Sequence, residues 1–160
     1  MIVPADHAYV VERLGRYHRT LRAGMHFLVP LIDRVAFRHS LLPVRTELTD
    51  RCITLDNVPV DVTTRVQWQI ADPERASYAS ANVQDFITGI VKTKQREAIA
   101  QKKWDDARET TRELQQSVLR ATAEAVAGVG AKLLAVEIRV ARHAPSGAAG
   151  FSPPRENPEG

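Results

Sequence analysis

Histidine, cysteine and paired acidic residues are the side chains through which this chain could bind a metal ion or catalyse a reaction. The five histidines are scattered, and no two have the spacing that brings two imidazoles to one metal on a helix. The sequence contains no phosphate-binding loop, dinucleotide fingerprint or serine-hydrolase motif. We therefore predict a protein that is not an enzyme and needs no metal or cofactor. The histidines are His7, His18, His26, His39 and His143.

Two further features could suggest chemistry, and both have simpler explanations. Cys52, the single cysteine, excludes an intrachain disulfide, and it alternates with Leu48 and Thr54 as a half-buried strand residue does. Asp105 and Asp106 are neighbours in a predicted helix, where consecutive side chains point in different directions. We therefore expect an unreactive cysteine and an acidic pair that caps a helix.

Basic residues gather in two segments of a chain whose net charge is only +3. They are either solvated surface charges or a surface that attracts anionic lipid headgroups, at about 1 kcal/mol per basic residue. Tyr9, Tyr17 and Trp104 could stack bases, but they do not form an interleaved aromatic–basic stripe, so nucleic acid is not a predicted partner. The first segment contains Arg13, Arg16, Arg19 and Arg22, and the second contains Lys92, Lys94, Arg96, Lys102 and Lys103.

An apolar run, Phe27-Leu28-Val29-Pro30-Leu31-Ile32, follows Gly24 and ends abruptly at Asp33-Arg34. Pro30 lacks a backbone N–H and disfavours helix at the residue before it. The run is also too short to span a bilayer as a helix, and no window of about 18 uncharged apolar residues occurs elsewhere. It is therefore either a turn buried against the domain core or an apolar wedge presented at a surface.

Strands are predicted wherever apolar and polar residues alternate. Positions 58–70 alternate cleanly, positions 44–55 less so, and positions 134–140 form a final strand. Asp56-Asn57 suits the tight turn between the first two of these strands, because both residues tolerate positive φ. A further short strand is predicted over positions 9–13.

Three helices are predicted between these strands. Asp72-Pro73 begins the first, Asn82 caps the second, and the third runs from about Asp105 to Val126. This order indicates an α+β fold, with a small, mainly antiparallel sheet and three helices packed on one side. The third helix carries a seam that would suit either its own sheet or another copy of the chain. The seam consists of Ala107, Thr111, Leu114, Val118 and Ala121.

Composition divides the chain into two parts. With 44% apolar and 26% charged residues, the chain suits one ordinary globular domain, which we assign to residues 1–143. Residues 144–160 are rich in Pro, Gly, Ser and Ala, so we predict that they form a disordered tail.

Several short motifs recur in a fixed order over residues 3–140, and each is weak alone. Together they resemble the stomatin/prohibitin family, also called band 7 or SPFH. They are Val10-Val11-Glu12-Arg13, Gly15-Arg16, Leu21, Gly24, residues 28–32 around Pro30, Asp33-Arg34, Thr54 to Val58, Asp72-Pro73, Ala76-Ser77-Tyr78, Arg96 and Val136-Glu137-Ile138-Arg139.

The resemblance implies a non-catalytic, membrane-associated scaffold that self-associates and regulates membrane proteins such as proteases or channels. It places the chain peripherally on the cytoplasmic side of a membrane. Arg13, Arg16, Arg19 and Arg22 would form a basic rim toward anionic lipid, and the helix seam is a hypothesis for contact between copies. The alternative is a soluble oligomerisation or adaptor domain. Implied membrane contacts are Val3, Pro4, Phe27, Leu28, Val29, Pro30 and Leu31.

Members of this family usually carry a membrane anchor before this domain and a long coiled-coil segment after it. Neither is found in the 160 residues. The chain is expected to be either an excised domain or a minimal member, and the sequence predicts no particular client, lipid, organelle or oligomer size.

Overall fold

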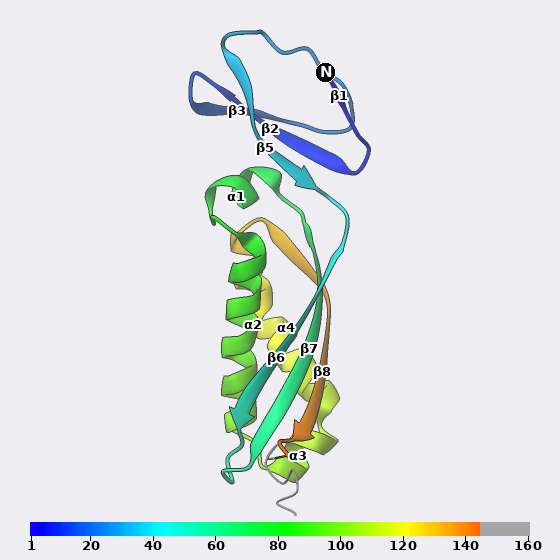
Figure 1. The fold of residues 1–160 in the computed structure, drawn as a ribbon, viewed down its shortest axis with the longest axis vertical. Helices are drawn as coiled ribbons and strands as arrows, with labels where there is room; N and C mark the ends of the chain where they lie inside the picture. The colour runs from blue at the N-terminus through cyan, green and yellow to red at the C-terminus, as the bar shows by residue number, and fades with distance from the viewer. Residues whose placement is uncertain (145–160) are drawn as a thin grey trace, which may run out of the picture.

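The computed structural model describes residues 1–144, and it consists of two parts stacked along the long axis of the molecule (Figure 1). The predicted tail, apart from Ala144, lies outside the described residues. The N-terminal part contains β1 (Ile2–Val3), β2 (His7–Arg13), β3 (Arg16–Leu21), β4 (Gly24–Met25) and β5 (Asp33–Ser40). The larger part contains β6 (Val44–Ile53), β7 (Pro59–Ile70), α1 (Pro73–Tyr78), α2 (Val83–Ala100), α3 (Trp104–Glu109), α4 (Thr111–Gly128) and β8 (Ala131–Arg142).

The N-terminal part is built around an antiparallel sheet in the order β3-β2-β5, beside a two-stranded pair of β1 and β4. Leu14 and Gly15 close the β2–β3 hairpin, and both have positive φ, as a tight two-residue hairpin turn requires. Its small core consists of the buried Val3, Val11 and Leu21. This core is separate from that of the larger part.

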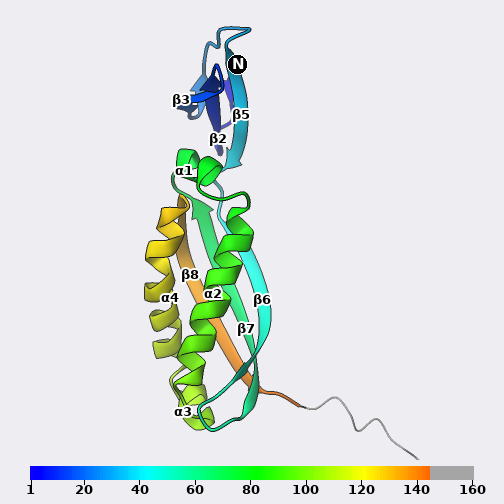
Figure 2. The same ribbon diagram turned by 90° about the vertical axis from the view of Figure 1, so that its left-hand side faces the viewer.

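The larger part is a β6-β7-β8 antiparallel sheet with α2 and α4 on one face (Figure 2). The even-numbered side chains of β7 point toward the helices, so Val60, Val62 and Val66 are buried. The predicted alternation over this strand is therefore confirmed. Asn57 has the positive φ expected of the predicted turn between β6 and β7.

The short helix α1 lies between the two parts (Figure 1). Its Tyr78 hydroxyl donates to Glu12 on β2 at 2.8 Å, and Ser77 Oγ lies 2.7 Å from Nε2 of His39 on β5. On its other side, Gly130 has φ +75°, and a Cβ there would lie 2.3 Å from the Asp72 carbonyl oxygen. Helix α1 therefore connects the N-terminal part to the larger part, and its close packing against residue 130 requires a glycine at that position.

The α+β class is confirmed, but two details of the prediction are wrong. The strands form three sheets rather than one, because the N-terminal strands pair among themselves. The predicted third helix is interrupted at Thr110, whose ψ of 34° departs from helical geometry, so residues 1–144 contain four helices.

The predicted seam for self-association is also wrong for most of its residues. Ala107, Leu114 and Val118 are completely buried, and the last two pack in the core of the larger part. Thr111 is half-buried, and of the five only Ala121 is exposed. Ala107, Leu114 and Val118 therefore pack inside the domain and are not accessible to a second copy.

Candidate membrane interface

Exposed apolar side chains gather on two neighbouring segments of the N-terminal part. Phe27 is 85% exposed and Leu31 is 102% exposed, so these side chains are not packed into a core. Leu14, in the β2–β3 turn, is 79% exposed. The predicted alternative of a turn buried against the domain core therefore fails for these side chains. We call the exposed set Leu14, Phe27, Val29, Leu31 and Ile32 the apolar tip.

One backbone hydrogen bond joins the two segments of the apolar tip, and two more fold the second segment. The N–H of Leu14 donates to the Ile32 carbonyl at 3.2 Å. The Val29 carbonyl accepts from the N–H of Asp33 at 3.0 Å and from that of Ile32 at 3.4 Å, which folds the loop into a turn. Leu31, inside this turn, has a φ of 80°. The loop is thus a defined structure that keeps apolar side chains in water.

The other predicted membrane contacts divide between surface and core. Pro4 and Pro30 are exposed. Val3 is 2% exposed and belongs to the small N-terminal core, so its prediction as a contact is wrong. Leu28 is half-buried and packs against the same core. Val3 and Leu28 therefore support the apolar tip from within.

Sequence reasoning missed Leu14, and it left Ile32, the last residue of the predicted apolar run, out of the implied membrane contacts. Leu14 lies between Arg13 and Gly15, where a turn normally takes polar residues, and a large apolar residue there was the available signal. Two further exposed apolar residues, Ile2 and Met25, oppose each other across β1 and β4. The apolar surface of the N-terminal part is thus larger than the predicted run.

The four predicted rim arginines have different surroundings. Arg13 binds the Asp33 carboxylate through Nε at 2.7 Å and a terminal nitrogen at 3.1 Å. Arg19 donates to the Phe27 carbonyl at 2.6 Å. Arg16 and Arg22 are exposed, and neither guanidinium makes a hydrogen bond or ion pair within residues 1–144, although the Arg22 carbonyl lies 2.7 Å from Nε2 of His26.

Electrostatics around the tip favour anionic surfaces. The hydrogen bonds from Arg13, and then the bond from the Val29 N–H at 3.0 Å, hold the pKa of Asp33 well below its usual range. Asp33 is therefore ionised at neutral pH, and its charge is matched by that of Arg13. The exposed arginines nearby, Arg16, Arg19 and Arg22, keep their positive charge.

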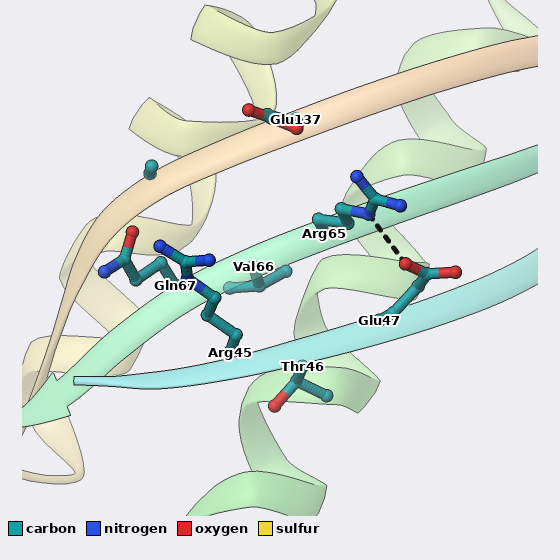
Figure 3. A pocket seen from close by; sticks show the side chains of 8 residues that line it. Arg45, Thr46, Glu47, Arg65, Val66, Gln67 and Glu137 are labelled. Atoms are coloured by element: carbon teal, nitrogen blue, oxygen red, sulfur yellow. Dashed lines mark hydrogen bonds and ion pairs between the residues drawn. The ribbon is translucent and has the colours of Figure 1, made fainter.

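A hollow of about 410 Å³ lies on the helix-free face of the β6-β7-β8 sheet (Figure 3). Arg65, on the central strand β7, binds Glu47 at 2.7 Å, and Arg45, Gln67 and Glu137 also line the hollow. No histidine, cysteine or hydroxyl nucleophile with a base lines it. The hollow is a charged sheet surface and offers no catalytic arrangement.

The remaining reactive groups also lack an arrangement for chemistry. Burial raises the pKa of the Cys52 thiol to about 11, so the thiol stays protonated at neutral pH. Ser77 donates its hydroxyl proton to the Pro73 carbonyl at 2.8 Å, which leaves its oxygen as an acceptor for His39. Within residues 1–144, no group of three His, Cys, Asp or Glu side chains is placed to hold a metal ion.

The helices of the described region are unsuited to crossing a bilayer. None of those within residues 1–144 combines the required length with the required apolar character.

Comparison with known proteins identifies the family. The model of the SPFH domain / Band 7 family matches residues 1–148. Human mitochondrial stomatin-like protein 2 is 30% identical over 140 residues, which are 87% of this chain and 39% of that protein. An uncharacterised protein of Schizosaccharomyces pombe is 36% identical over 138 residues, 86% of this chain and 39% of that protein.

The worm relative extends the same similarity. Stomatin-like protein stl-1 of Caenorhabditis elegans is 29% identical over 138 residues, 86% of this chain and 43% of that protein. The chain thus spans about two fifths of the length of the curated relatives that it matches. Because the family model covers most of its residues, this chain belongs to the SPFH domain / Band 7 family.

Proposed function

We propose that this domain is a non-catalytic unit of a membrane-associated scaffold and contacts the bilayer surface peripherally through the apolar tip. Membership of the family and similarity to stomatin-like proteins support a membrane-associated scaffold in general. One structural observation carries the finer proposal: an ordered loop keeps Phe27 and Leu31 almost fully exposed beside exposed arginines that have no acidic partner within residues 1–144. Such an arrangement is costly in water and favourable at a lipid surface.

The free energies expected for the apolar tip suit weak, reversible contact with a membrane. Full burial of an apolar side chain of this size contributes about 1.5–3 kcal/mol, and an interfacial position buries only part of each side chain. Each nearby arginine adds about 1 kcal/mol at an anionic surface. A contact of this size resembles a single lipid anchor, which binds membranes reversibly.

The shape of the molecule supports an upright orientation. The loop between β4 and β5, which carries most of the apolar tip, lies at one end of the long axis, while α3 and the β6–β7 turn lie at the other (Figures 1 and 2). Contact through the tip would direct the larger part away from the lipid. Because anionic lipids are enriched in the cytoplasmic leaflet, we place the domain on that side.

Other copies of the chain and membrane proteins such as proteases or channels are the proposed partners. Three of the five seam residues are completely buried, so contact between copies needs a further surface. Within residues 1–144, β6 and β8 are the edge strands of the large sheet, and each has backbone groups unpaired on one side. These edges also support the second candidate, a soluble oligomerisation or adaptor domain without membrane contact.

Vesicle flotation separates the two candidates. The domain should float with anionic vesicles at low salt, and Phe27→Ser should reduce the bound fraction. Leu55→Ser is the matched control, because Leu55 is 59% exposed in the turn that joins β6 to β7. Absence of flotation would contradict membrane contact and favour the soluble domain, whereas equal flotation of all three proteins would contradict contact through Phe27.

A further inference from the structure

We infer that Arg13 and Arg19 are positioning residues, which hold the apolar loop in its presented form, whereas Arg16 and Arg22 act only by electrostatic attraction. This inference rests on the proposed membrane contact and divides its basic rim into two kinds of arginine. The division follows from what each guanidinium binds in the structure.

Arg13 fixes the end of the loop. Its two hydrogen bonds engage both carboxylate oxygens of Asp33, whose side chain is completely buried in this contact. One of those oxygens also accepts the Val29 N–H at 3.0 Å. The guanidinium therefore orients a carboxylate that closes the turn from Val29 to Asp33, inside which Leu31 has positive φ.

Arg19 fixes the beginning of the loop. It lies on β3 opposite Val11 of β2, and its guanidinium reaches across to the Phe27 carbonyl at 2.6 Å. Arg13 lies on β2 of the same hairpin. The two ends of the loop are thus tied to one rigid hairpin by two different side chains.

The physical benefit of these ties is preorganisation. In water a loop with several apolar side chains gains by collapsing onto nearby apolar surface, and ordering it again at a membrane costs conformational entropy. A loop held open beforehand avoids that cost on binding. The benefit does not depend on lipid charge. Arg13 is neutralised by Asp33, so positioning is its main contribution, whereas Arg19 keeps its charge and contributes in both ways.

Partition to two kinds of vesicle tests the inference. Arg13→Met and Arg19→Met should each weaken binding about three- to tenfold on uncharged phosphatidylcholine vesicles as well as on vesicles that contain phosphatidylserine. Arg16→Met and Arg22→Met should weaken binding only on the phosphatidylserine vesicles. Equal behaviour of the four variants on uncharged vesicles would overturn the division.

Hydrogen exchange in the free protein gives a readout that needs no membrane. The Val29 N–H should exchange faster in Arg13→Met and Arg19→Met than in the wild type. Its exchange rate should be unchanged in Arg16→Met and Arg22→Met. Arg13→Lys keeps the positive charge but loses the bidentate contact with Asp33. The Val29 N–H should therefore exchange as fast in this variant as in Arg13→Met. Wild-type exchange in Arg13→Lys would contradict the positioning role. If the wild type binds neither vesicle, the membrane function fails while the exchange data still decide the role of both arginines.

Discussion

The backbone N–H of Leu14 donates to the carbonyl oxygen of Ile32 at 3.2 Å, which joins the tip of the β2–β3 hairpin to the end of the apolar loop. Leu14 thereby adds a side chain that is 79% exposed to the exposed side chains of residues 27–32. The apolar tip is consequently one surface made from two segments, and its properties can be tested one residue at a time.

Leu14 should show a conflict between stability and membrane binding. Its φ of 51° is unfavourable for leucine and well tolerated by asparagine. Leu14→Asn should therefore raise the free energy of unfolding by about 0.5–1 kcal/mol and lower vesicle binding several-fold. Denaturant unfolding and flotation of the same samples measure both effects. Unchanged vesicle binding would remove Leu14 from the contact surface.

Gly130 should be intolerant of any side chain. A Cβ there would lie 2.3 Å from the Asp72 carbonyl oxygen and 2.6 Å from the Ala76 nitrogen, both backbone atoms. Gly130→Ala should lower the free energy of unfolding by about 1–3 kcal/mol or more, because α1 must move and φ is positive. The matched control is Gly89→Ala in α2, where nothing lies within 4 Å and helix propensity predicts a gain of about 0.5–1 kcal/mol. Chemical denaturation measures whether each variant loses or gains stability.

A buried polar pair in the main core should behave as a unit. Thr64 donates to Oε1 of Gln95 at 2.6 Å, both residues are completely buried, and Nε2 of Gln95 has no partner within residues 1–144. Thr64→Val should cost about 1–3 kcal/mol, since it also leaves the amide oxygen unpaired. The double variant Thr64→Val with Gln95→Leu should recover most of that loss. Additive losses in the double variant would contradict the coupling.

His39 should make stability depend on pH under mildly acidic conditions. Its half-buried position lowers the pKa of its imidazole, so the folded state favours the neutral ring. The resulting stabilisation is complete above the ordinary histidine pKa of about 6.5 and is lost as the pH falls through the lower, folded-state value.

A comparison of histidine variants isolates this contribution. His39→Gln should flatten the curve of unfolding free energy against pH in the range below the ordinary histidine pKa. His18→Gln, at an exposed position, serves as the control. A curve for His39→Gln that falls as steeply as the wild type on acidification would refute the assignment.

The regular elements were predictable because their patterns are local. The alternation over β7, the Asp72 and Asn82 caps, and the turn at Asn57 all appear in the structure where the sequence places them. Each depends on a few adjacent residues and on the period of one element. The interruption at Thr110 was missed because an apolar repeat continues across it.

The apolar tip was only partly predictable because pairing sets the side-chain directions there. The pairing of β2 with its neighbours shifts register beside Val10 and Val11, and both residues are buried despite being adjacent. No simple alternation could therefore place Val3 in the core and Leu14 in water. The choice of Arg13 as partner of Asp33 likewise depends on strand register, because these residues are paired across β2 and β5.

The most direct test of membrane contact uses an environment-sensitive dye on single introduced cysteines. The native Cys52 is buried, so the wild type should label little in the folded state and supplies the background. With anionic vesicles, the dye on Leu31→Cys should shift to the blue and gain intensity, and the dye on Leu55→Cys should not change. Equal spectra at position 31 with and without vesicles, or the same shift at both positions, would contradict contact through the apolar tip.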